Sequence, residues 1–356
     1  MKDGHYMKCA SLVFLTLQNV VVVLMSRYVR SRPGDMFIAS TAVTMSEVVK
    51  FIVCVGLVWL VEEKGSIRGF FSNIHTNLLT DWRDNLLIGV PGVIYAVQNN
   101  LVYIAVSHLN PSVFQVTYQM KVFTTVIFFR LILHRVLTFK HWIALSLLFV
   151  GVITAQIDPQ NIAKTPVAGE PDQIPIYGFI CVFVACFLSG FSGVFFELML
   201  KSTQKTIVLR NIQLSIYGIV ASIAQAFIQE NKVIVEHGFF FGYDMSVWFV
   251  ILLQSLGGLL VAAAVRYADN VLKTFATSVA IVLTLVASVL IFNTPLTIHL
   301  VLGNILVIGA TAMYSMLPPP KQVAPIAPII VDEDRRPLIS NIDSATVRIP
   351  EKPTDS

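Results

Sequence analysis

The sequence predicts an all-α polytopic membrane protein, and three observations carry that prediction. Hydrophobic residues make up 55% of the 356 residues, whereas charged residues make up only 13%, well below the share in soluble domains. The apolar residues are grouped in blocks of about 18–25, the length at which a helix crosses a bilayer. Short polar stretches separate the blocks and are too short to fold as domains. Any binding site is therefore expected within the membrane.

Ten apolar blocks predict ten membrane-spanning helices. They are 9–26, 36–61, 85–106, 111–133, 140–157, 176–200, 210–228, 246–267, 272–292 and 296–317. The first block has no small-residue cleavage site after it and is interpreted as a retained helix rather than a signal peptide. All four cysteines fall inside apolar blocks, which predicts buried thiols rather than disulfides.

The distribution of lysine and arginine predicts that both termini lie in the cytosol. With that orientation 18 of the 25 basic residues face the cytosol, 5 face the opposite side and 2 lie inside spans. Short cytosolic loops are enriched in lysine and arginine, so this ratio decides the orientation. A cluster at Arg27, Arg30 and Arg32 is a local exception to it.

The chain divides into two halves of five spans each. Residues 1–157 form the first predicted repeat, 158–175 a lumenal linker, 176–317 the second repeat and 318–356 a disordered cytosolic tail. Because five is an odd number, the second half is inverted relative to the first. This architecture is common in secondary transporters, whose substrate site lies between the repeats near the bilayer midplane.

Charged residues inside the predicted spans are the candidate functional residues, because burying them in a bilayer is costly. Lys121 lies near the middle of its span, with no acidic residue within a turn. It predicts either an anchor for a phosphate group or an ion pair with another helix. Glu47 and Lys50 are one turn apart and are expected to pair with each other. Glu197 could pair similarly with Lys201.

Two further features each allow two interpretations. Lys273 begins its span from the cytosolic side and by itself is typical of an interfacial lysine. The amides of Asn99 and Asn100 could bind the edge of a nucleobase or brace a helix contact.

Several signatures of other functions are missing from the sequence. There is no glycine-rich phosphate loop and no cluster of histidine or cysteine at metal-binding spacing. We therefore expect no cofactor, no metal, no nucleic-acid partner and no catalytic residues. A membrane-embedded glycosyl- or phosphotransferase is the alternative from another class, but it would need an acidic cluster that isolated Asp244 and Asp269 do not provide.

Three long segments resemble the nucleotide-sugar transporters of the branch that carries CMP-sialic acid and UDP-galactose. They are QNNLVYIAVSHLNPSVFQVTYQMKVFTTV (98–126), GFSGVFFELMLK (190–201) followed by RNIQL (210–214), and GGLLVAAAVRYADNVLKTFATSVAIVL (257–283). The segment 18–43, Phe114 and GFFFGY (238–243) resemble the members specific for UDP-galactose. The resemblance covers all ten predicted spans and implies a drug/metabolite transporter fold.

The resemblance also implies a set of site residues. Residues at the positions of Lys121 and Lys273 meet the substrate phosphates, and others line the nucleotide pocket, namely Tyr95, Asn99, Ser189 and Asn211. Further candidates for the cavity or its gating are Tyr118, Glu197, Ser215, Tyr217, Glu47 and Lys50. The sequence departs from the family at Leu198, where lysine is usual, and at Thr274, where glycine is usual.

The implied function is exchange of UDP-galactose for UMP across the Golgi membrane. The alternative substrate is UDP-N-acetylglucosamine, alone or together with UDP-galactose. Besides the bilayer, the candidate partners are a second copy of the chain, a glycosyltransferase and a sorting adaptor. The adaptor would bind the cytosolic tail, where Asp334, Leu338 and Ile339 have the spacing of an acidic dileucine signal.

Overall fold

The computed structural model describes residues 2–32, 34–76, 82–132, 134–156, 174–202, 205–267, 270–318 and 321–322, without the side chains of 2–11, 200–202, 258–275 and 321–322. Its elements are α1 Lys2–Ser31, α2 Ala39–Leu57, η1 Val58–Glu62, α3 Ile67–Ile74, α4 Trp82–His108, α5 Pro111–Thr117, α6 Met120–Leu131, β1 Arg135–Val136, α7 Phe139–Gln156, α8 Pro175–Ser202, α9 Ile207–Gln229, α10 Asn231–His237, α11 Met245–Tyr267, α12 Asn270–Phe292, α13 Ile298–Met316 and β2 Lys321–Gln322.

The structure has the long apolar helices of a multi-pass membrane protein. Within the described residues, seven spans are long and apolar enough to cross a bilayer: the apolar part of α1, α2 with η1, and helices α4, α7, α8, α9 and α13. The predicted span 111–133 is instead divided into two short helices, α5 and α6. Helices α11 and α12 are each apolar over a shorter described stretch.

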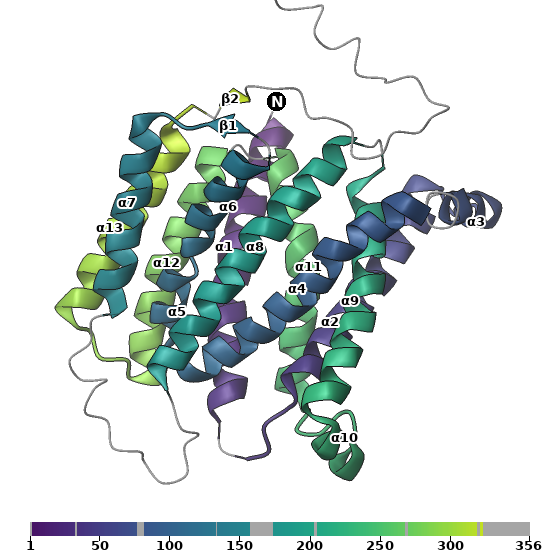
Figure 1. Ribbon diagram of the computed structural model, residues 1–356, viewed down its shortest axis with the longest axis horizontal. Helices are drawn as coiled ribbons and strands as arrows, with labels where there is room; N and C mark the ends of the chain where they lie inside the picture. Colours follow the sequence, from purple (N-terminus) through teal and green to yellow (C-terminus); the bar gives the residue numbers. More distant parts are fainter. Residues whose placement is uncertain are drawn as a thin grey trace, which may run out of the picture.

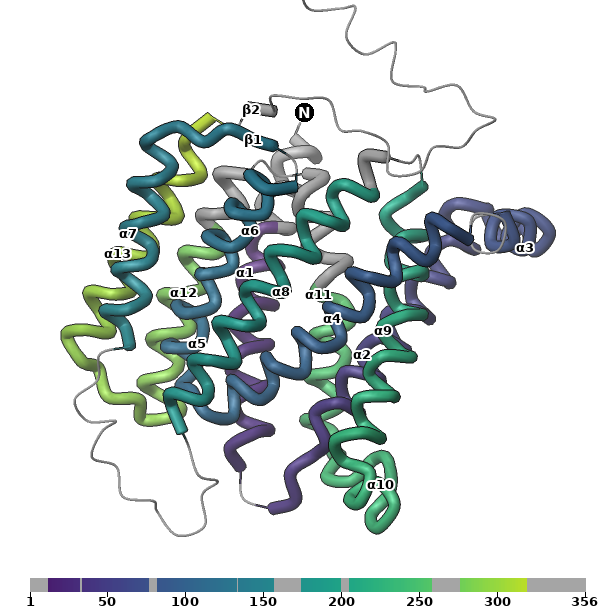
Figure 2. Tube along the Cα trace, in the orientation of Figure 1, coloured from purple at the N-terminus to yellow at the C-terminus, as the bar shows by residue number. Residues whose placement is uncertain are grey.

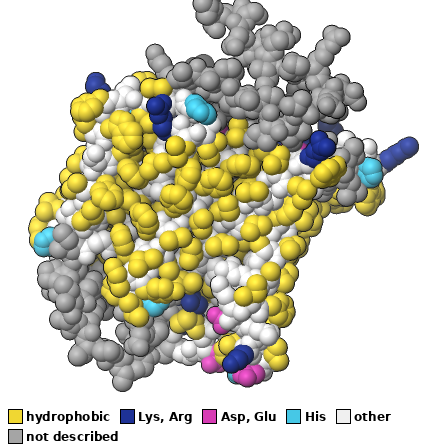
Figure 3. Space-filling view, in the orientation of Figure 1, with side chains coloured by type: hydrophobic (Ala, Val, Ile, Leu, Met, Phe, Trp, Pro, Cys, Tyr) yellow, Lys and Arg dark blue, Asp and Glu magenta, His cyan; other side chains and the backbone are white. Residues whose placement is uncertain are grey.

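The surface agrees with a membrane environment. Figure 3 shows hydrophobic side chains over the middle of one face, with the lysine and arginine side chains gathered toward its two ends. Large apolar side chains such as Ile52, Val220 and Leu290 are more than half exposed although they lie within long helices. A protein in water would bury these side chains, whereas lipid is their natural surroundings.

The helices pack side by side as one bundle, in a regular pattern (Figures 1 and 2). Helix α4 packs against α8 and α9, and α11 packs in the same way against α1 and α2. Helix α6 packs against α8, as α12 packs against α1. Three further pairs, α2 with α9, α5 with α12 and α7 with α13, join one half of the chain to the other.

Small residues allow the closest of these helix contacts. At Gly303 on α13, an added Cβ would lie 2.6 Å from the backbone nitrogen of Ala155 on α7. At Gly151 on α7 it would lie 2.9 Å from Val307 of α13. Close backbone approach of this kind holds helices together in lipid, where the hydrophobic effect does not drive helices together.

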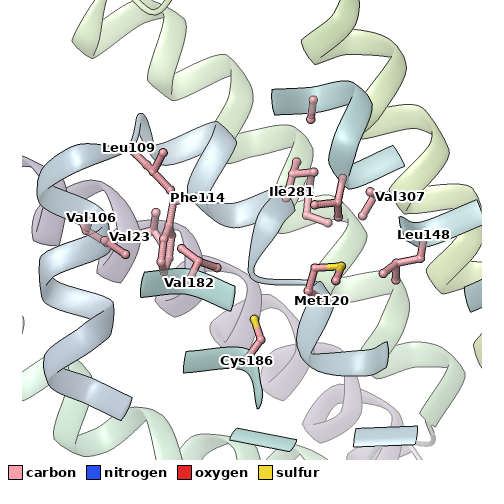
Figure 4. Packing of buried hydrophobic residues seen from close by; sticks show 14 of the residues in the cluster. Val23, Val106, Leu109, Phe114, Met120, Leu148, Val182, Cys186, Ile281 and Val307 are labelled. Atoms are coloured by element: carbon pink, nitrogen blue, oxygen red, sulfur yellow. The ribbon is translucent and has the colours of Figure 1, made fainter. Parts of the chain in front are cut away.

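A buried apolar cluster joins both halves of the chain around the middle of the bundle. Figure 4 shows Phe114, Met120 and Val182 of this cluster, which come from α5, α6 and α8. Ile281 of α12 and Val307 of α13 extend it into the second half. The cluster therefore fixes the positions of α5 and α6, the two short helices into which the predicted span 111–133 is divided.

Two short strands depart from the all-α prediction. Strand β1 pairs antiparallel with β2, with Arg135 opposite Gln322 and Val136 opposite Lys321. The first residues of the predicted disordered tail are thus tied to the loop before α7, because backbone pairing does not depend on an apolar sequence. The dileucine spacing at Asp334, Leu338 and Ile339 lies outside the described residues.

Candidate substrate-binding site

The helix predicted over 111–133 is broken at Tyr118 and Gln119. Helix α5 ends at Thr117 and α6 begins at Met120. The backbone N–H of Gln119 donates to Val116 O at 3.1 Å, and that of Lys121 donates to Tyr118 O at 3.2 Å, so the turn is tightened to a three-residue spacing. Such turns often mark functional hinges. Residues 115–123 around the break include neither glycine nor proline, so the break could not be predicted from the sequence.

Lys121 lies in the first turn of α6, directly after the break. A helix N-terminus carries a partial positive charge, so a lysine there adds charge of the same sign. The N-cap residue Gln119 makes no side-chain hydrogen bond to the helix. Dipole and ammonium together favour an anion at this position. The Lys121 Nζ also lies 4.6 Å from the centroid of the Tyr118 ring, a cation–π distance.

Tyr118 connects Lys121 to helices α4 and α8. Its hydroxyl accepts a hydrogen bond from Gln98 Nε2 at 3.0 Å and lies beside the hydroxyl of Ser189. Its ring stacks on Phe114, with centroids 5.4 Å apart. The structure thus brings together three predicted site residues from two different parts of the chain. Gln98 was missed, although it directly precedes the two asparagines that the sequence singled out.

Tyr95 and Tyr217 meet where α4, α8 and α9 converge. Both pack against the buried cluster of Ile88, Met199 and Leu214. Tyr217 packs on Gly89 and Gly92 of α4. An added Cβ would lie 3.0 Å from the Tyr217 ring at Gly89 and 2.9 Å from the Tyr217 Cβ at Gly92. These two glycines let the tyrosine approach the α4 backbone.

The polar residues predicted on α4 and α9 have unequal surroundings. The Ser215 hydroxyl is fully buried and has no hydrogen-bond partner within the described part of the chain. Half-buried Asn99 likewise forms no hydrogen bond to a described residue. Asn211 donates from Nδ2 to Ile207 O at 2.9 Å within its own helix. Asn211 and Ser215 lie one turn apart and therefore on one face of α9.

The pair expected between Glu47 and Lys50 forms within α2. The Lys50 Nζ lies 2.6 Å from Glu47 Oε2 and 2.8 Å from Oε1. Glu47 is buried and packs against Gly218 of α9, where an added Cβ would lie 3.0 Å from its carboxylate. The pair is therefore placed at the contact between α2 and α9, one helix from each half of the chain.

Glu197 has a partner that the sequence did not indicate. Its Oε1 lies 2.6 Å from Arg135 Nη2, and the Arg135 guanidinium also lies 4.3 Å from the centroid of the Phe129 ring. The pair joins α8 to the loop after α6. The side chains of Lys201 and Lys273 lie outside the described residues, and Lys273 is placed only as a first-turn residue of α12.

A buried ion-pair cluster between α4 and α9 was also missed. Arg210 is completely buried and forms hydrogen bonds with both carboxylate oxygens of Asp84, at 2.7 and 2.9 Å. Lys205 binds the same carboxylate at 2.7 Å, and Arg210 also donates to Gln213 Oε1 at 2.9 Å. The charge count treated Arg210 as an ordinary loop cation. The structure corrects this, because its partner lies 126 residues earlier in the chain.

These contacts describe what the centre of the bundle can bind. It offers one cation at a helix N-terminus, several tyrosine rings and a set of hydroxyl and amide groups. This combination suits a ligand with a phosphate and a flat, polar ring. Among the described residues, no three histidine, cysteine, aspartate or glutamate side chains are close enough to hold a metal ion.

Similarity to known proteins agrees with this chemistry. The family profile of nucleotide-sugar transporters matches residues 3–315. The chain is 42% identical over 313 residues to the bovine UDP-galactose translocator, covering 87% of this chain and 78% of that protein. It is 41% identical to the UDP-galactose/UDP-N-acetylglucosamine transporter of Caenorhabditis elegans, covering 87% of this chain and 82% of that protein.

The fold has a counterpart of known structure. A protein solved by crystallography matches with a TM-score of 0.52 at 12% identity, covering 88% of this chain and 97% of that one. At this identity the match concerns the fold alone. The profile match extends over almost all of the described helices and spans the positions of Asp84, Lys121 and Arg210. The chain belongs to the nucleotide-sugar transporter family.

Proposed function

We propose that this protein carries UDP-galactose into the Golgi lumen in exchange for UMP. The observation that carries the proposal is the 42% identity to UDP-galactose translocators over 87% of the chain. The nucleoside diphosphate carries charge that cannot cross hydrocarbon, so its passage needs a polar path through the bundle. The positive first turn of α6 supports that requirement, because it lies among buried helices rather than at a surface.

The proposed substrate contacts follow from the geometry around the helix break. Lys121 binds the phosphates, with Tyr118 and Ser189 beside it, and Tyr95, Asn99 and Asn211 line the nucleotide part. Lys273 supplies a second cation from the first turn of α12. Ser215 and Tyr217 complete the wall on α9, while the Glu47–Lys50 and Arg135–Glu197 pairs act in gating.

The proposed architecture is ten spans in two inverted repeats of five. Its support is the packing pattern. This pattern repeats when each predicted membrane span is replaced by the span five positions away in the order of the chain. The contacts of α4 with α8 and α9 then become those of α11 with α1 and α2, and the contact of α6 with α8 becomes that of α12 with α1. Helix α5–α6 pairs with α12, so Lys121 and Lys273 occupy helices related by this exchange.

Exchange follows from the charge in the site. Lys121 and Lys273 give the proposed site two cationic residues, and a bound anion offsets their charge. Coulomb energies are large in a low-dielectric interior, so reorientation with an anion bound is favoured over reorientation without one. UDP-galactose in one direction and UMP in the other satisfy this requirement. With both termini in the cytosol, UDP-galactose moves from the cytosol to the lumen and UMP moves from the lumen to the cytosol.

The decisive experiment is uptake of radiolabelled UDP-galactose by proteoliposomes. Vesicles preloaded with UMP should take up label many times faster than empty vesicles. Equal uptake in both would contradict exchange, and no uptake in either would contradict transport of this substrate. Unlabelled UDP-N-acetylglucosamine serves as the competitor, because the C. elegans relative is named for both sugars. Equal competition by the two nucleotide sugars would establish dual specificity.

Lys121→Ala tests the phosphate contact. We expect exchange to fall by at least about tenfold, since a charged hydrogen bond to phosphate contributes about 1.5–3 kcal/mol. Lys121→Arg should recover part of the activity, because it keeps the charge but not the shape of the donor. Lys140→Ala, which alters an exposed lysine at the start of α7, is the matched control. Wild-type exchange by Lys121→Ala would remove Lys121 from the site.

A further inference from the structure

A cavity opens at the end of the bundle opposite the N-terminus, away from the proposed substrate contacts. Its volume is about 410 Å³, within the range of pockets that hold small organic ligands. Residues of the α1–α2 connection, of α4 and of the segment around α10 line it. Figure 1 places α10 and the α1–α2 connection at this end. In the proposed orientation the cavity faces the lumen.

One wall of the cavity carries a buried arginine without a carboxylate partner. Arg30 is 9% exposed and forms no ion pair with any described residue. Its Nε donates to Ser107 Oγ at 2.6 Å and its Nη1 to Phe37 O at 2.9 Å. The Nη2 group is left without a hydrogen-bond partner in the described part of the chain. The guanidinium lies over the Phe37 ring, with Cζ 5.2 Å from the ring centroid, and can still donate to an anion in the cavity.

Two further polar groups face the same cavity without partners. Asn100 and Ser40 are each 2% exposed, and neither Asn100 Nδ2 nor Ser40 Oγ has a hydrogen-bond partner among described residues. Ser40 also lies in the first turn of α2, whose N-cap residue, Ile38, offers no side-chain hydrogen bond. The first amide groups of that helix therefore remain available to an anion. Buried donors rarely stay unpaired, so these groups indicate a ligand.

The remaining lining residues define the rest of that ligand. Asp35 and Glu230 are exposed carboxylates at the cavity, and Glu230 interacts electrostatically with Arg30. They can accept hydrogen bonds from sugar hydroxyls, as acidic residues do for ribose in dinucleotide-binding proteins. Ile104 and Phe241 add an apolar side and an aromatic ring. A phosphate, a ribose and a base together match these three kinds of group.

The cavity wall is held in place before any ligand binds. At Gly242, with φ of +69°, an added Cβ would lie 2.6 Å from the backbone nitrogen of Phe37. An ion pair of Arg32 with Asp244 fastens the same connection to the start of α11. The Phe37 ring packs edge-on against Tyr103, with centroids 5.6 Å apart. A wall that is already rigid loses little conformational entropy when a ligand binds, so the entropic cost of binding is lower.

We propose that this cavity is a second nucleotide site, which binds a nucleoside monophosphate at the lumenal face before it enters the bundle. Arg30, Asn100, Ser40 and the first turn of α2 hold the phosphate. The carboxylates hold the ribose. The proposal rests on the proposed function, because it takes the exchanged nucleotide to be the ligand. The site concentrates that nucleotide at the entrance opposite the one used by the nucleotide sugar.

The test is protection of a cysteine inside the cavity. Val233→Cys places a thiol on the cavity lining, and Val235→Cys, on the exposed side of the same helix, is the matched control. Full-length protein in nanodiscs is alkylated with N-ethylmaleimide, and the wild type measures the background from the natural cysteines. At ten times the dissociation constant, UMP should slow alkylation of Val233→Cys about tenfold by mass action. Alkylation of Val235→Cys should not change.

Additional substitutions separate this site from the central one. Protection should persist in a Lys121→Ala background and disappear with Ser40→Ala/Asn100→Ala. Uridine should not protect, and inorganic phosphate should protect only at higher concentration. Protection that is absent, that is lost with Lys121→Ala or that survives Ser40→Ala/Asn100→Ala would overturn the proposal. Equal protection by phosphate and UMP would overturn the nucleoside assignment. None of these readouts measures transport, so failure of UDP-galactose uptake would be a separate result.

Discussion

The two ends of the bundle hold their buried arginines in opposite ways. At the end near the N-terminus, Arg210 is neutralised by Asp84, and a second cation, Lys205, joins the same carboxylate. At the other end, Arg27 and Arg30 donate to backbone carbonyls and a serine hydroxyl. One end therefore holds its buried arginine by charge pairing, whereas the other end holds its arginines by hydrogen bonds to carbonyl and hydroxyl oxygens.

The difference follows from what each arginine joins. Arg210 links α9 to α4, so separating these helices would leave a buried charge on both sides. Arg27 donates from Nη1 to Val106 O at 2.9 Å and to Ser107 O at 2.5 Å, in the last turn of α4. A cation at a helix C-terminus is stabilised by the dipole and satisfies carbonyls that the helix leaves unpaired. The ion pair of Arg210 with Asp84 suits a gate, whereas the hydrogen bonds of Arg27 to α4 suit a contact between helices that do not move apart.

The largest effect is expected for Asp84→Asn. This change leaves Arg210 buried without its counter-ion, which costs about 3–5 kcal/mol in known buried pairs. We expect a large drop in the thermal unfolding midpoint in detergent. Lys205→Met is the control, because it keeps the pair of Asp84 and Arg210, and it should cost much less. Similar midpoints for Asp84→Asn and the wild type would show that Arg210 does not depend on this carboxylate.

A smaller effect is expected for Arg27→Met. It removes the hydrogen bonds to the last turn of α4, each worth about 1–3 kcal/mol when a buried acceptor is left unpaired. The substitution removes the buried cation itself, whereas Asp84→Asn leaves one behind, so the loss should be smaller than for Asp84→Asn. Thermal unfolding of both variants under one set of conditions makes this comparison. A lower unfolding midpoint for Arg27→Met than for Asp84→Asn would contradict the difference between the two ends of the bundle.

A still smaller effect is expected for Glu197→Gln, at the N-terminal end. The carboxylate side chain is 32% exposed and its partner Arg135 is 16% exposed, so the pair contributes about 1 kcal/mol or less. We expect nearly unchanged thermal unfolding and an unchanged apparent affinity for the nucleotide sugar in the uptake assay. A selective loss of affinity would instead place Glu197 in the substrate site.

The smallest effect is expected for Asp244→Asn and should depend on pH. Burial raises the pKa of Asp244, but the hydrogen bond and charge of Arg32 outweigh it, and the pKa falls below its ordinary value of 3.8. Because the pKa of Asp244 is lower in the folded state, its carboxylate stabilises the fold when the pH is above the pKa of the unfolded state. This contribution is lost as the pH falls through the pKa of the folded state. Unfolding midpoints of variant and wild type should differ at pH 7 and converge below about pH 4. A constant difference would contradict this linkage.

Local features of the site could be predicted from the sequence, whereas its long-range contacts could not. The pair of Glu47 and Lys50 follows from helical spacing alone, and it forms. Pro111 correctly predicts the start of α5, where it occupies the first turn. Asp84 lies just before the predicted span 85–106 and far from Arg210 in the chain, so the sequence did not indicate that the two would pair. Spacing within one helix says nothing about which other helix will be its neighbour.

The broken helix shows a second limit. Residues 111–133 form one apolar block, and the segment around Tyr118 has no glycine or proline. The break comes from tertiary contacts instead. The carbonyl oxygen of Tyr118 accepts a hydrogen bond from the Cys186 thiol at 3.5 Å, and its hydroxyl is held by Gln98 of α4. Contacts from two other helices therefore fix a turn that the local sequence would have made regular.

The contact of Arg27 with α4 has a consequence for how the chain is made. The carbonyls that receive this guanidinium lie 79 and 80 residues later, so they are still unsynthesised when α1 first meets the membrane. In the proposed orientation, the arginines at the end of α1 are solvated cations on the side that the charge rule disfavours until α4 arrives. The orientation of the first helix is therefore secured late in biosynthesis, when α4 docks against it. A chain that stops before Ser107 would lack that anchor and should insert its first helix in mixed orientations.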